Sequence, residues 1–346
     1  MRAVVYEDVG RVSVGEIPDP ILLDQGDVIL RVTASAICGS DLHFFHGKAP
    51  LDPGETIGHE AIGVVEACGP AVEHFRPGDR AVVSFVIVCG TCWFCRNGQT
   101  QLCEDFRNLG AGILGGGLGG AQAELVRVPA ADVNLLHVPE SMTDERALFL
   151  GDVLTTGYYG AAISRIGPSD TVAVVGAGPV GFFCVQAAIA LGAARVLALD
   201  LEPDRLRLAE AVGASAIDAR ARHASMAVAE QTEGRGADVV IEAVGHPSAF
   251  ETAVDAVRRG GRITVVGMYT SEILEIQAGV WWSRALELRF GGVCPVHAWW
   301  ERAMAEVEAD RIDPTPIVSH RLPLEEAPLG YELFETHRAT KVLLFP

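Results

Sequence analysis

Short apolar runs separated by turn residues dominate about the first 135 residues of the chain. These runs are rich in valine, isoleucine and alanine and lie at residues 28–34, 63–67, 80–85 and 123–128. Pro-Gly pairs at 53–54 and 77–78 interrupt the same part of the chain. Such a combination is typical of short strands joined by turns. This part of the sequence therefore predicts a mainly β domain.

From about Thr171 the pattern becomes an alternation of β-branched apolar runs and alanine-rich helical segments. Strands are expected at 172–175, 195–199, 239–242 and 262–266. Helices are expected at 179–191, 204–212 and 249–257, the first two stopped by Gly192 and Gly213. Successive strand–helix units of this kind predict an α/β fold with a parallel sheet covered by helices on both faces. After about Val293 the pattern is mixed again, with a helix near 298–309 and a last strand at 341–345.

Length and composition fit two folded domains. The chain has 346 residues, of which 49% are apolar and 21% charged, and a typical domain has about 150 residues. Lys and Arg number 27 against 45 Asp and Glu, which gives a net charge of −18. An acidic chain without a basic segment would be repelled by nucleic acid and by anionic membrane surfaces. We therefore expect neither partner.

Targeting and membrane signals are not evident in the sequence. The first residues lack a charged segment followed by an apolar stretch and a cleavage site, so no secretory signal is expected. The longest apolar runs are broken well short of the ~20 residues that a membrane-spanning helix needs. A cytoplasmic location is the resulting expectation.

A glycine-rich motif stands between the first strand and the first helix of the alternating region. It reads G-A-G-P-V-G and consists of Gly176, Ala177, Gly178, Pro179, Val180 and Gly181. Glycines at these places allow a tight turn, and the helix N-terminus offers unpaired N–H groups and a positive dipole to a pyrophosphate. A lone motif of this type can be a simple loop, but its place between a strand and a helix predicts a dinucleotide site.

Asp200 ends the next predicted strand, 19 residues after Gly181. A carboxylate at this position hydrogen-bonds an adenosine ribose and repels a 2′-phosphate, so the expected cofactor is NAD and not NADP. Arg205 and Arg207 follow closely and would soften this preference if they reach the site. A second glycine-rich stretch at 110–120 precedes a predicted strand and not a helix. We expect that stretch to be a mobile surface loop.

Four cysteines lie within fifteen residues. Cys89, Cys92, Cys95 and Cys103 are separated by two, two and seven residues, and Gly90 and Gly98 are available for sharp turns. Four closely spaced thiolates suit a closed tetrahedral zinc site that stabilises the fold. An iron–sulfur cluster and a redox pair of thiols are the alternatives. The other four cysteines are scattered, which argues against a disulfide framework.

A second set of candidate ligands is spread along the chain. The segment Cys38-Gly-Ser40-Asp41-Leu-His43 follows a predicted strand, and G-H-E-A-I-G-V-V-E-A-C-G-P-A-V begins at Gly58. Together with the four-cysteine segment and the G-A-G-P-V-G turn, the sequence resembles the zinc-dependent medium-chain alcohol dehydrogenases over essentially its whole length. Aspartate in Gly151-Asp152-Val153 is similar to the tetrameric bacterial and formaldehyde-dehydrogenase-like branches of that family.

The resemblance implies a domain organisation. Residues 1–153 and 294–346 would form a GroES-like, mainly β catalytic domain with a structural zinc lobe at 89–103. Residues 154–293 would form an inserted Rossmann domain with a doubly wound parallel sheet that binds NAD. It also implies a second, catalytic zinc ion, so that each chain would hold two. The proposed ligands of the catalytic zinc are Cys38, His59 and Asp152, with Glu60 as a transient or outer ligand.

The resemblance also assigns roles around this zinc. Ser40 and His43 would carry the substrate proton to solvent, whereas His46 is a surface bystander and Asp41 is structural. Phe85 would line an apolar substrate pocket, and Thr156 would approach the nicotinamide.

The expected reaction is reversible hydride transfer between a primary or secondary alcohol, or the corresponding aldehyde or ketone, and NAD. Formaldehyde, polyol and amino-alcohol dehydrogenases of the same family are alternatives, and a non-enzymatic dinucleotide-binding protein is a rival of another class. The expected assembly is a homotetramer, with a dimer as the alternative. The aromatic pairs Trp281-Trp282 and Trp299-Trp300 would serve an interface or fill the cleft between domains.

Overall fold

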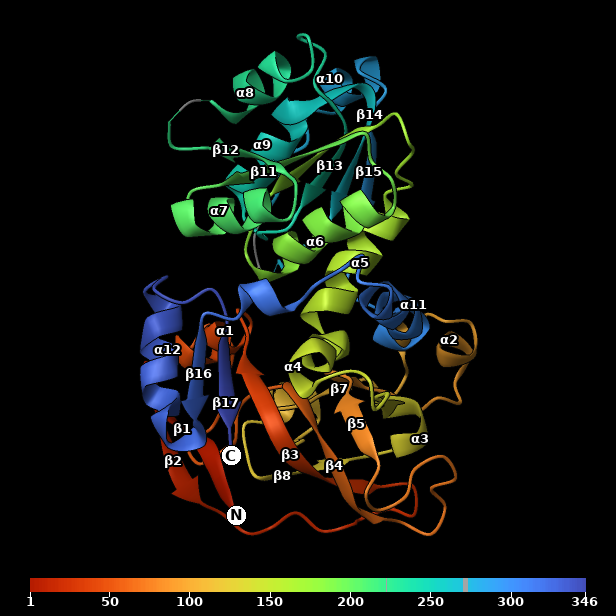
Figure 1. The fold of residues 1–346 in the computed structure, drawn as a ribbon, viewed down its shortest axis with the longest axis vertical. Helices are drawn as coiled ribbons and strands as arrows, with labels where there is room; N and C mark the ends of the chain where they lie inside the picture. The colour runs from red at the N-terminus through yellow and green to blue at the C-terminus, as the bar shows by residue number, and fades with distance from the viewer. Residues whose placement is uncertain (222, 270–272) are drawn as a thin grey trace. The chain divides into compact units, whose positions relative to one another are not determined.

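The computed structural model describes residues 1–221, 223–269 and 273–346 and divides the chain into two compact units (Figure 1). The first unit comprises Met1–Asp152, Pro295–Met304 and Pro314–Pro346, and the second comprises Val153–Cys294 and Ala305–Asp313. The second unit is thus inserted into the first. Residues 305–313, expected in the first unit, belong to the second because the last turn of helix α11 (Val296–Glu308) and the segment after it pack there.

The first unit is built around a mainly antiparallel sheet. Its strand order is β16-β17-β3-β4-β5-β9, and β8 pairs with the first half of β3. These strands are β3 (Val28–Ile37), β4 (Glu60–Cys68), β5 (Arg80–Val83), β8 (Leu125–Val128), β9 (Leu135–His137), β16 (His320–Pro323) and β17 (Val342–Phe345). Two two-stranded sheets accompany it, formed by β1 (Arg2–Asp8) with β2 (Arg11–Glu16) and by β6 (Val86–Ile87) with β7 (Arg107–Asn108).

Helices in the first unit are short and connect the strands. They are α1 (Asp41–Phe45), α2 (Trp93–Arg96), α3 (Ala131–Asn134), α4 (Asp144–Ala147) and α12 (Ala327–Glu335), with 3₁₀ turns η1 (Thr100–Leu102), η2 (Gly112–Gly115), η3 (Leu148–Gly151), η4 (Thr315–Ile317) and η5 (Leu324–Glu326). One apolar core lies under β3, β4 and β5 and includes Val32, Phe75 and Val83. A second core packs α12 against the end of β3 and includes Ile37 and Tyr331.

The second unit contains a six-stranded parallel sheet with the order β12-β11-β10-β13-β14-β15. Its strands are β10 (Thr171–Val175), β11 (Arg195–Asp200), β12 (Ser215–Asp218), β13 (Ala237–Glu242), β14 (Val257–Val265) and β15 (Glu287–Phe290). Every residue of the central strands β10 and β13 is buried. Continuous burial of this kind is expected for parallel strands with both faces covered.

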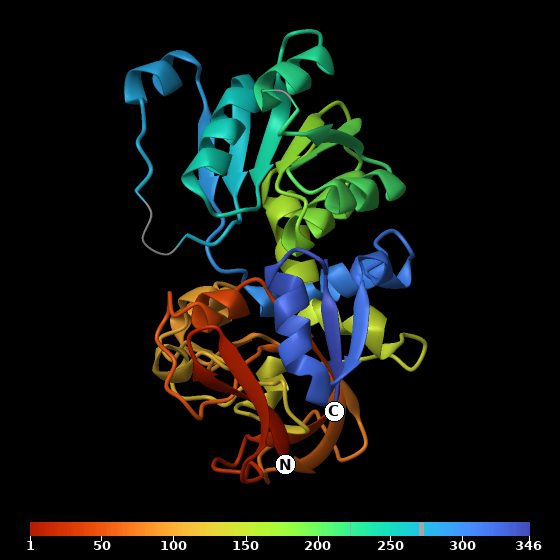
Figure 2. The ribbon, with the colours of Figure 1, turned by 90° about the vertical axis from the view of Figure 1, so that its left-hand side faces the viewer.

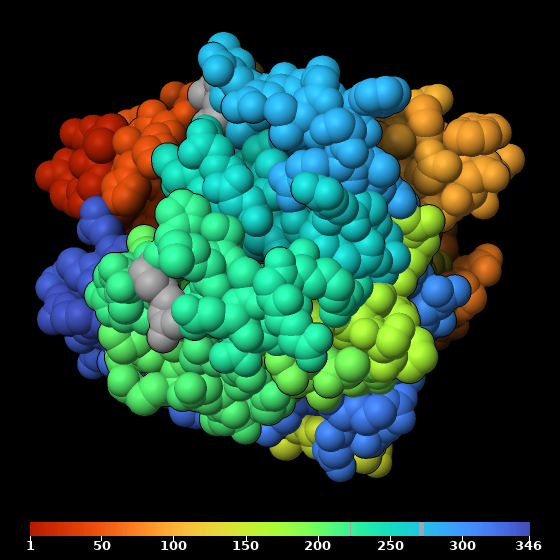
Figure 3. All heavy atoms as spheres, turned by 90° about the horizontal axis from the view of Figure 1, so that it is seen from above, coloured from red at the N-terminus to blue at the C-terminus, as the bar shows by residue number. Residues whose placement is uncertain are grey.

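Helices cover both faces of this sheet (Figure 2). They are α5 (Val153–Ile163), α6 (Pro179–Ala190), α7 (Pro203–Ala211), α8 (Ala224–Glu230), α9 (Pro247–Ala256) and α10 (Ala278–Ser283). The strand order reverses between β10 and β13, so right-handed crossovers place α6 and α9 on opposite faces. Figure 3 looks onto this unit, where the green and blue-green segments that carry α8 and α9 form much of the visible surface. Among the described residues, no helix is long and apolar enough to cross a membrane.

The glycine-rich stretch at 110–120 is a surface loop only in part, because Ile113 and Leu114 are exposed whereas other positions are packed. Gly112, Gly115 and Gly120 are buried, and the stretch contains the turn η2. A Cβ at Gly120 would lie 2.2 Å from the carbonyl oxygen of Ile57, so the backbones approach too closely for any side chain. These glycines therefore permit packing beside the strand entry at residues 57–60.

Candidate active site and metal centres

One end of the sheet in the first unit gathers four potential metal ligands. Cys38 directly follows β3, and His59 and Glu60 stand at the start of β4. The two strands are antiparallel, with Ala36 opposite Glu60, so their register brings these residues to the same edge. Asp152 arrives from η3, where the N–H of Phe85 donates to the carbonyl of Gly151 and ties the turn to the end of β5.

These four side chains converge in a buried cluster. One donor atom from each of Cys38, His59, Glu60 and Asp152 lies within 4.8 Å of all the others. His59 Nε2 is 3.2 Å from Asp152 Oδ2, and Cys38 Sγ is 3.7 Å from the same oxygen. Because a thiol, an imidazole and carboxylates converge here within 4.8 Å of one another, the cluster has the donor set of a catalytic zinc site.

The buried acidic groups of the cluster favour the binding of a cation. Three acidic groups, Cys38, Glu60 and Asp152, are buried with one lysine. Burial raises the pKa of Cys38, because a thiolate loses its hydration when it is buried. Burial lowers the pKa of His59, but Asp41, Cys38 and Asp152 together hold it well above its ordinary value. In the absence of metal a proton thus takes the place of the positive charge, and a divalent ion fits these residues.

Asp41 orients His59 and is more than the structural residue that we expected. Its Oδ1 lies 3.0 Å from His59 Nδ1, and its Oδ2 accepts the N–H of Cys38 at 2.9 Å. The carboxylate therefore holds Nδ1 and leaves Nε2 facing the donor cluster, as is common for metal-ligating histidines. Sequence reasoning missed this role, although the spacing Cys38-x-x-Asp41 within a single turn offered a signal.

Lys341 is a second residue that the sequence did not single out. Its Nζ lies 2.9 and 2.7 Å from the two oxygens of Glu60, and neither side chain has any exposed surface. Burial raises the pKa of Glu60 to about 7, although Lys341 acts in the opposite direction. The only lysines among the 27 basic residues are Lys48 and Lys341, and this rarity was the available signal. Glu60 therefore has a cationic partner of its own beside the cluster.

The residues expected to form a proton path lie in and beside α1. Ser40 Oγ is 3.2 Å from His59 Nε2 and 3.4 Å from Cys38 Sγ, so the hydroxyl borders the donor cluster. His43 lies in α1 and is half-buried. His46 instead pairs with Glu335 at 2.7 Å, which agrees with its interpretation as a bystander.

Phe85 borders the same cluster from another strand end. Its ring lies 6.1 Å from that of His59, between centroids, and is half-buried. An aromatic ring beside the donor cluster supplies an apolar wall there.

The four-cysteine lobe is a second metal candidate. The sulfurs of Cys89, Cys92, Cys95 and Cys103 lie within 4.8 Å of one another. Cys89 Sγ accepts the N–H groups of Thr91 and Cys92, both at 3.4 Å. Burial works against ionisation of Cys89, but these hydrogen bonds lower its pKa to about 6. Such N–H donors stabilise thiolates, and Gly90 and Gly98 adopt the positive φ values of 70° and 68° that the turns require. The arrangement fits a closed zinc site.

His297 anchors this lobe to the body of the first unit. Its Nδ1 lies 3.1 Å from Thr100 Oγ1, within the lobe, and its Nε2 lies 3.0 Å from Asn134 Oδ1. Asn134 also bonds both backbone groups of Val88, the residue before Cys89.

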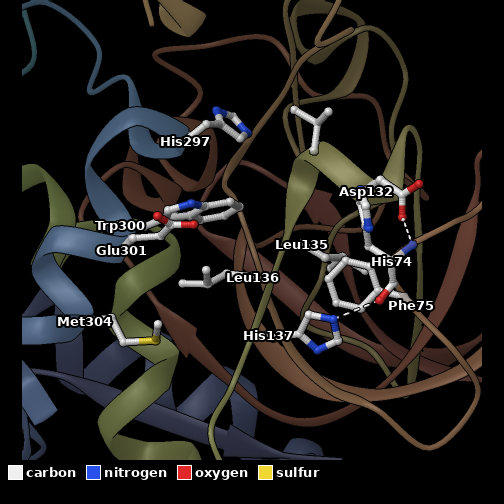
Figure 4. Close-up of a pocket in the computed structure, with 11 residues that line it drawn as sticks. His74, Phe75, Asp132, Leu135, Leu136, His137, His297, Trp300, Glu301 and Met304 are labelled. Carbon is white, nitrogen blue, oxygen red and sulfur yellow. Dashed lines mark hydrogen bonds between the residues drawn. The ribbon is translucent and has the colours of Figure 1, made fainter.

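Figure 4 shows His297 and Trp300 at one side of a groove of about 600 Å³, with Phe75 and His137 stacked at the other. The groove contains none of the proposed metal ligands.

The glycine turn of the second unit has the geometry expected of a dinucleotide site. Gly176 has a φ of 89°, and a Cβ at Gly181 would lie 1.8 Å from the carbonyl oxygen of Gly176. Gly178 is the N-cap of α6 and has no side chain to cover the helix end, and Pro179 and Val180 begin that helix. The first-turn N–H groups are therefore available to a phosphate.

Asp200 is built into this turn. Its Oδ2 accepts the N–H of Ala177 at 2.6 Å, and its Oδ1 accepts the N–H groups of Leu201 and Glu202. Arg205 Nη1 stands 3.8 Å from Asp200 Oδ2 and therefore reaches the site. Arg207 instead pairs with Asp204 on the exposed face of α7. Thr156 lies half-buried in α5 of the same unit.

The tryptophan pairs are split between interior and surface. Trp281 is half-buried, with its ring 5.7 Å from that of Phe250, whereas Trp282 is 85% exposed. Trp300 is buried, and Trp299 carries Arg302 over its ring at 4.9 Å. Neither pair acts as a unit, because adjacent helical residues point in different directions.

Comparisons with known proteins agree with this geometry. Residues 24–140 match the alcohol dehydrogenase GroES-like domain, and residues 179–307 match the zinc-binding dehydrogenase family. A Mycobacterium tuberculosis protein named "Probable zinc-binding alcohol dehydrogenase" is 40% identical over 96% of this chain and 84% of its own length. The uncharacterised zinc-type alcohol dehydrogenase-like protein AdhB of Bacillus subtilis is 36% identical over the full length of both. The structure of the alcohol dehydrogenase TADH from Thermus sp. ATN1 superposes with a TM-score of 0.96 at 43% identity, covering 100% of this chain and 99% of that one.

The chain belongs to the zinc-dependent medium-chain alcohol dehydrogenase family. Its fold is the expected combination of a GroES-like domain and a Rossmann domain, and it is a zinc-dependent alcohol dehydrogenase. The expected family, fold class and reaction class are thereby confirmed.

Proposed function

We propose that this alcohol dehydrogenase uses NAD and that Cys38, His59 and Asp152 hold its catalytic zinc. The buried convergence of a thiol, an imidazole and a carboxylate carries the proposal. A catalytic zinc site combines three protein donors with one open position, and this set provides three. Glu60 is the fourth candidate donor, but its ion pair with Lys341 favours an outer role. Cys89, Cys92, Cys95 and Cys103 would hold the second, structural zinc.

The chemistry divides between the bound groups and the residues around them. Zinc, when bound, acts as a Lewis acid that polarises an alcohol or carbonyl oxygen and makes the alcohol more acidic. The nicotinamide, when bound, exchanges the hydride. Asp41 holds the ring of His59 in place, and Phe85 excludes water from one side of the donor cluster.

Ser40 and His43 form the proposed path for the substrate proton. Ser40 Oγ borders the donor cluster, so it is placed to accept a hydroxyl proton from a substrate held there. His43 lies three residues further along, one helical turn away, and an imidazole transfers protons readily near neutral pH. Ser40→Ala should therefore lower kcat for alcohol oxidation more than it changes zinc content, and metal analysis beside steady-state kinetics checks this.

Asp200 supports NAD as the cofactor. Its buried carboxylate is fixed by three backbone N–H groups beside the glycine turn, so it cannot turn away from a 2′-phosphate at low cost. Arg205 supports the alternative, because it reaches the same site. Relatives differ in this respect: a Sinorhizobium meliloti zinc-binding dehydrogenase, 31% identical, is bound to NADP, and an Escherichia coli CFT073 enzyme, 28% identical, holds NADH.

The cofactor assignment is tested by kcat/KM for NAD and NADP. We expect NAD to be preferred in the wild type and the preference to shrink in Asp200→Ala. Arg205→Ala should leave the NAD preference in place or increase it. A wild-type preference for NADP would contradict the assignment.

The substrate class is tested by a panel of formaldehyde, aliphatic alcohols, aromatic alcohols, polyols and amino alcohols. Phe85 beside the donor cluster favours an alcohol with an apolar substituent over a polyol. A substrate preference for polyols would contradict this part of the proposal.

Assembly and compartment are the remaining parts of the proposal. The second unit ends in the edge strand β15 and carries exposed apolar side chains at Val280, Trp282 and Phe290, which supports a homotetramer or dimer formed through this surface. None of the eight cysteines is in a disulfide, which supports a reducing compartment such as the cytoplasm. Light scattering of the purified protein tests the assembly, with a monomer as the contradicting result.

A further inference from the structure

Behind His59, the chain of polar contacts continues past Asp41 into the last helix, α12. Gln122 Nε2 donates to Asp41 Oδ2 at 3.1 Å, and the Tyr331 hydroxyl donates to Gln122 Oε1 at 2.9 Å. Gln122 and Tyr331 have no exposed surface, and Asp41 is 1% exposed. Four buried side chains thus link α12 to a proposed zinc ligand.

The contacts of Gln122 and Asp41 fix which of their side-chain atoms donate and which accept. Gln122 Nε2 also donates to the carbonyl of Ala36 at 3.2 Å. The amide oxygen must therefore face Tyr331 and accept the hydrogen bond from its hydroxyl. Asp41 Oδ2 is taken up by Gln122 and by the N–H of Cys38, which leaves Oδ1 for His59 Nδ1. With metal bound, the imidazole would therefore keep its proton on Nδ1, and Nε2 would present its lone pair to the donor cluster.

Gln122 and Tyr331 are held in place by close packing. A Cβ on Gly58, the residue before His59, would lie 2.4 Å from Gln122 Cγ, so the glutamine passes directly beside the strand entry. The Tyr331 ring stacks on Phe45 with centroids 5.3 Å apart. Removal of the tyrosine hydroxyl would therefore leave its ring packing intact and break a single hydrogen bond.

We propose that Gln122 and Tyr331 are positioning residues that fix the ring orientation and tautomer of His59 and thereby hold metal at the Cys38–His59–Asp152 site. The inference rests on the proposed zinc assignment. Outer partners of metal-bound histidines commonly change metal affinity by about 10–100-fold when they are removed. Tyr331 acts through two intermediates, so its effect should fall near the lower end of that range.

The test measures zinc release into a chelator from the full-length protein. Tyr331→Phe should release one zinc per chain about 10-fold faster than the wild type, which is the lower end of the range for outer partners of a metal-bound histidine. Release of the second zinc should not change. Gln122→Met, which removes the hydrogen bonds with Asp41, Tyr331 and the carbonyl of Ala36 at similar volume, should release the same ion faster still. Tyr159→Phe is the matched control, because that buried hydroxyl donates to the carbonyl of Gly291 in the second unit.

Two further measurements separate positioning from general stability. The visible spectrum of the cobalt-substituted protein should shift in Tyr331→Phe and Gln122→Met and not in Tyr159→Phe. In an Asp41→Asn background, Tyr331→Phe should add no further acceleration, because the chain is already cut. Equal release rates and spectra in the wild type and both variants, or an effect that is fully additive with Asp41→Asn, would overturn the inference. A wild type that binds only one zinc per chain would instead overturn the zinc assignment on which it rests.

Discussion

Lys341 and Glu60 form an ion pair in which neither side chain has exposed surface. A buried carboxylate that loses its cation remains desolvated and unpaired, which commonly costs about 3–5 kcal/mol. We predict that Lys341→Met lowers the free energy of unfolding by about this amount. Urea denaturation of the zinc-loaded protein measures the change.

Lys48 supplies the control for this experiment. It is exposed, and it is the only other lysine of the chain. Lys48→Met should change the free energy of unfolding by less than about 0.5 kcal/mol. Equal stability of the Lys341 and Lys48 variants would show that the buried pair does not need its cation.

His297 gives a prediction for the pH dependence of stability. Burial lowers its pKa to about 3, whereas an unfolded histidine titrates near 6.5. The unfolded chain therefore binds a proton below pH 6.5 that the folded chain does not bind. The stability contribution of this group is complete above pH 6.5 and is lost as the pH falls toward 3, by about 2 kcal/mol between pH 6.5 and 5.

Comparison with His297→Gln isolates this group. The variant should lose about 2 kcal/mol less than the wild type over that pH interval, as measured by urea denaturation at pH 6.5 and 5. His223→Gln, at an exposed position, should behave like the wild type. The same pH dependence in both variants would contradict a neutral His297.

Ligand candidates were visible in the sequence, whereas their supports were not. Cys38, His59 and Asp152 stand in recognisable motifs, and the structure brings them together. Asp41 was assigned too small a role, because its spacing from Cys38 does not by itself show that it faces His59. Lys341 was missed because it reaches Glu60 only through the pairing of β17 with β3, Val342 opposite Ile37. Contacts that depend on strand register across 281 positions leave no local pattern.

At the level of elements, the turn between β10 and α6 depends on Gly181. A methyl group there would lie 1.8 Å from the carbonyl oxygen of Gly176, which the backbone cannot relieve without movement. We predict that Gly181→Ala weakens NADH binding at least about tenfold, equivalent to about 1.4 kcal/mol. Titration of NADH fluorescence measures the affinity.

Gly279 is a suitable comparison, because among the described residues nothing beyond its chain neighbours and its own helix backbone lies within 4 Å of a Cβ built there. It belongs to α10, where alanine favours the helix by about 1 kcal/mol or less. Gly279→Ala should therefore retain wild-type NADH affinity. Unchanged affinity in Gly181→Ala would mean that the turn does not approach the cofactor.

The cysteine lobe should respond as a structural element. Cys95→Ser removes one of four sulfurs from a closed site, so we predict the loss of one zinc per chain and a lower thermal midpoint. Metal analysis and thermal denaturation measure these effects. Loss of zinc without any loss of stability would contradict the structural role.

Element boundaries were predictable where the pattern is regular. The strands and helices that were predicted in the second unit lie near their expected positions, because the runs that form β10 and β13 are buried on both faces. The edge strands β12 and β15, which are largely not buried, and the helices α8 and α10 were not predicted. The hairpin of β1 and β2 and the short strand β16 were also not anticipated. The strands β2 and β16 are half-exposed and carry a weak apolar pattern, whereas the mostly buried β1 was overlooked. The stretch at 110–120 is exposed in part, as expected, but its composition did not show that several of its glycines serve close backbone contact.

At the scale of the whole molecule, two units were expected from length and from the change in pattern near Thr171, and the insertion of the second unit into the first was expected from the family resemblance. The sequence did not show that residues 305–313 belong to the second unit, because helix α11 continues without a break from the first unit into the second. The net charge of −18 excludes some partners but does not indicate the substrate. Function follows from the site and not from bulk composition.

Zinc content and NADH formation, measured on the wild type and on Cys38→Ala, test the central claim most directly. The wild type should contain two zinc ions per chain and should reduce NAD in the presence of at least one alcohol of the panel. Cys38→Ala should contain one zinc ion, should still bind NADH, and should not turn over. Two zinc ions and full activity in Cys38→Ala, or a zinc-replete wild type that forms no NADH with any alcohol, would contradict the account.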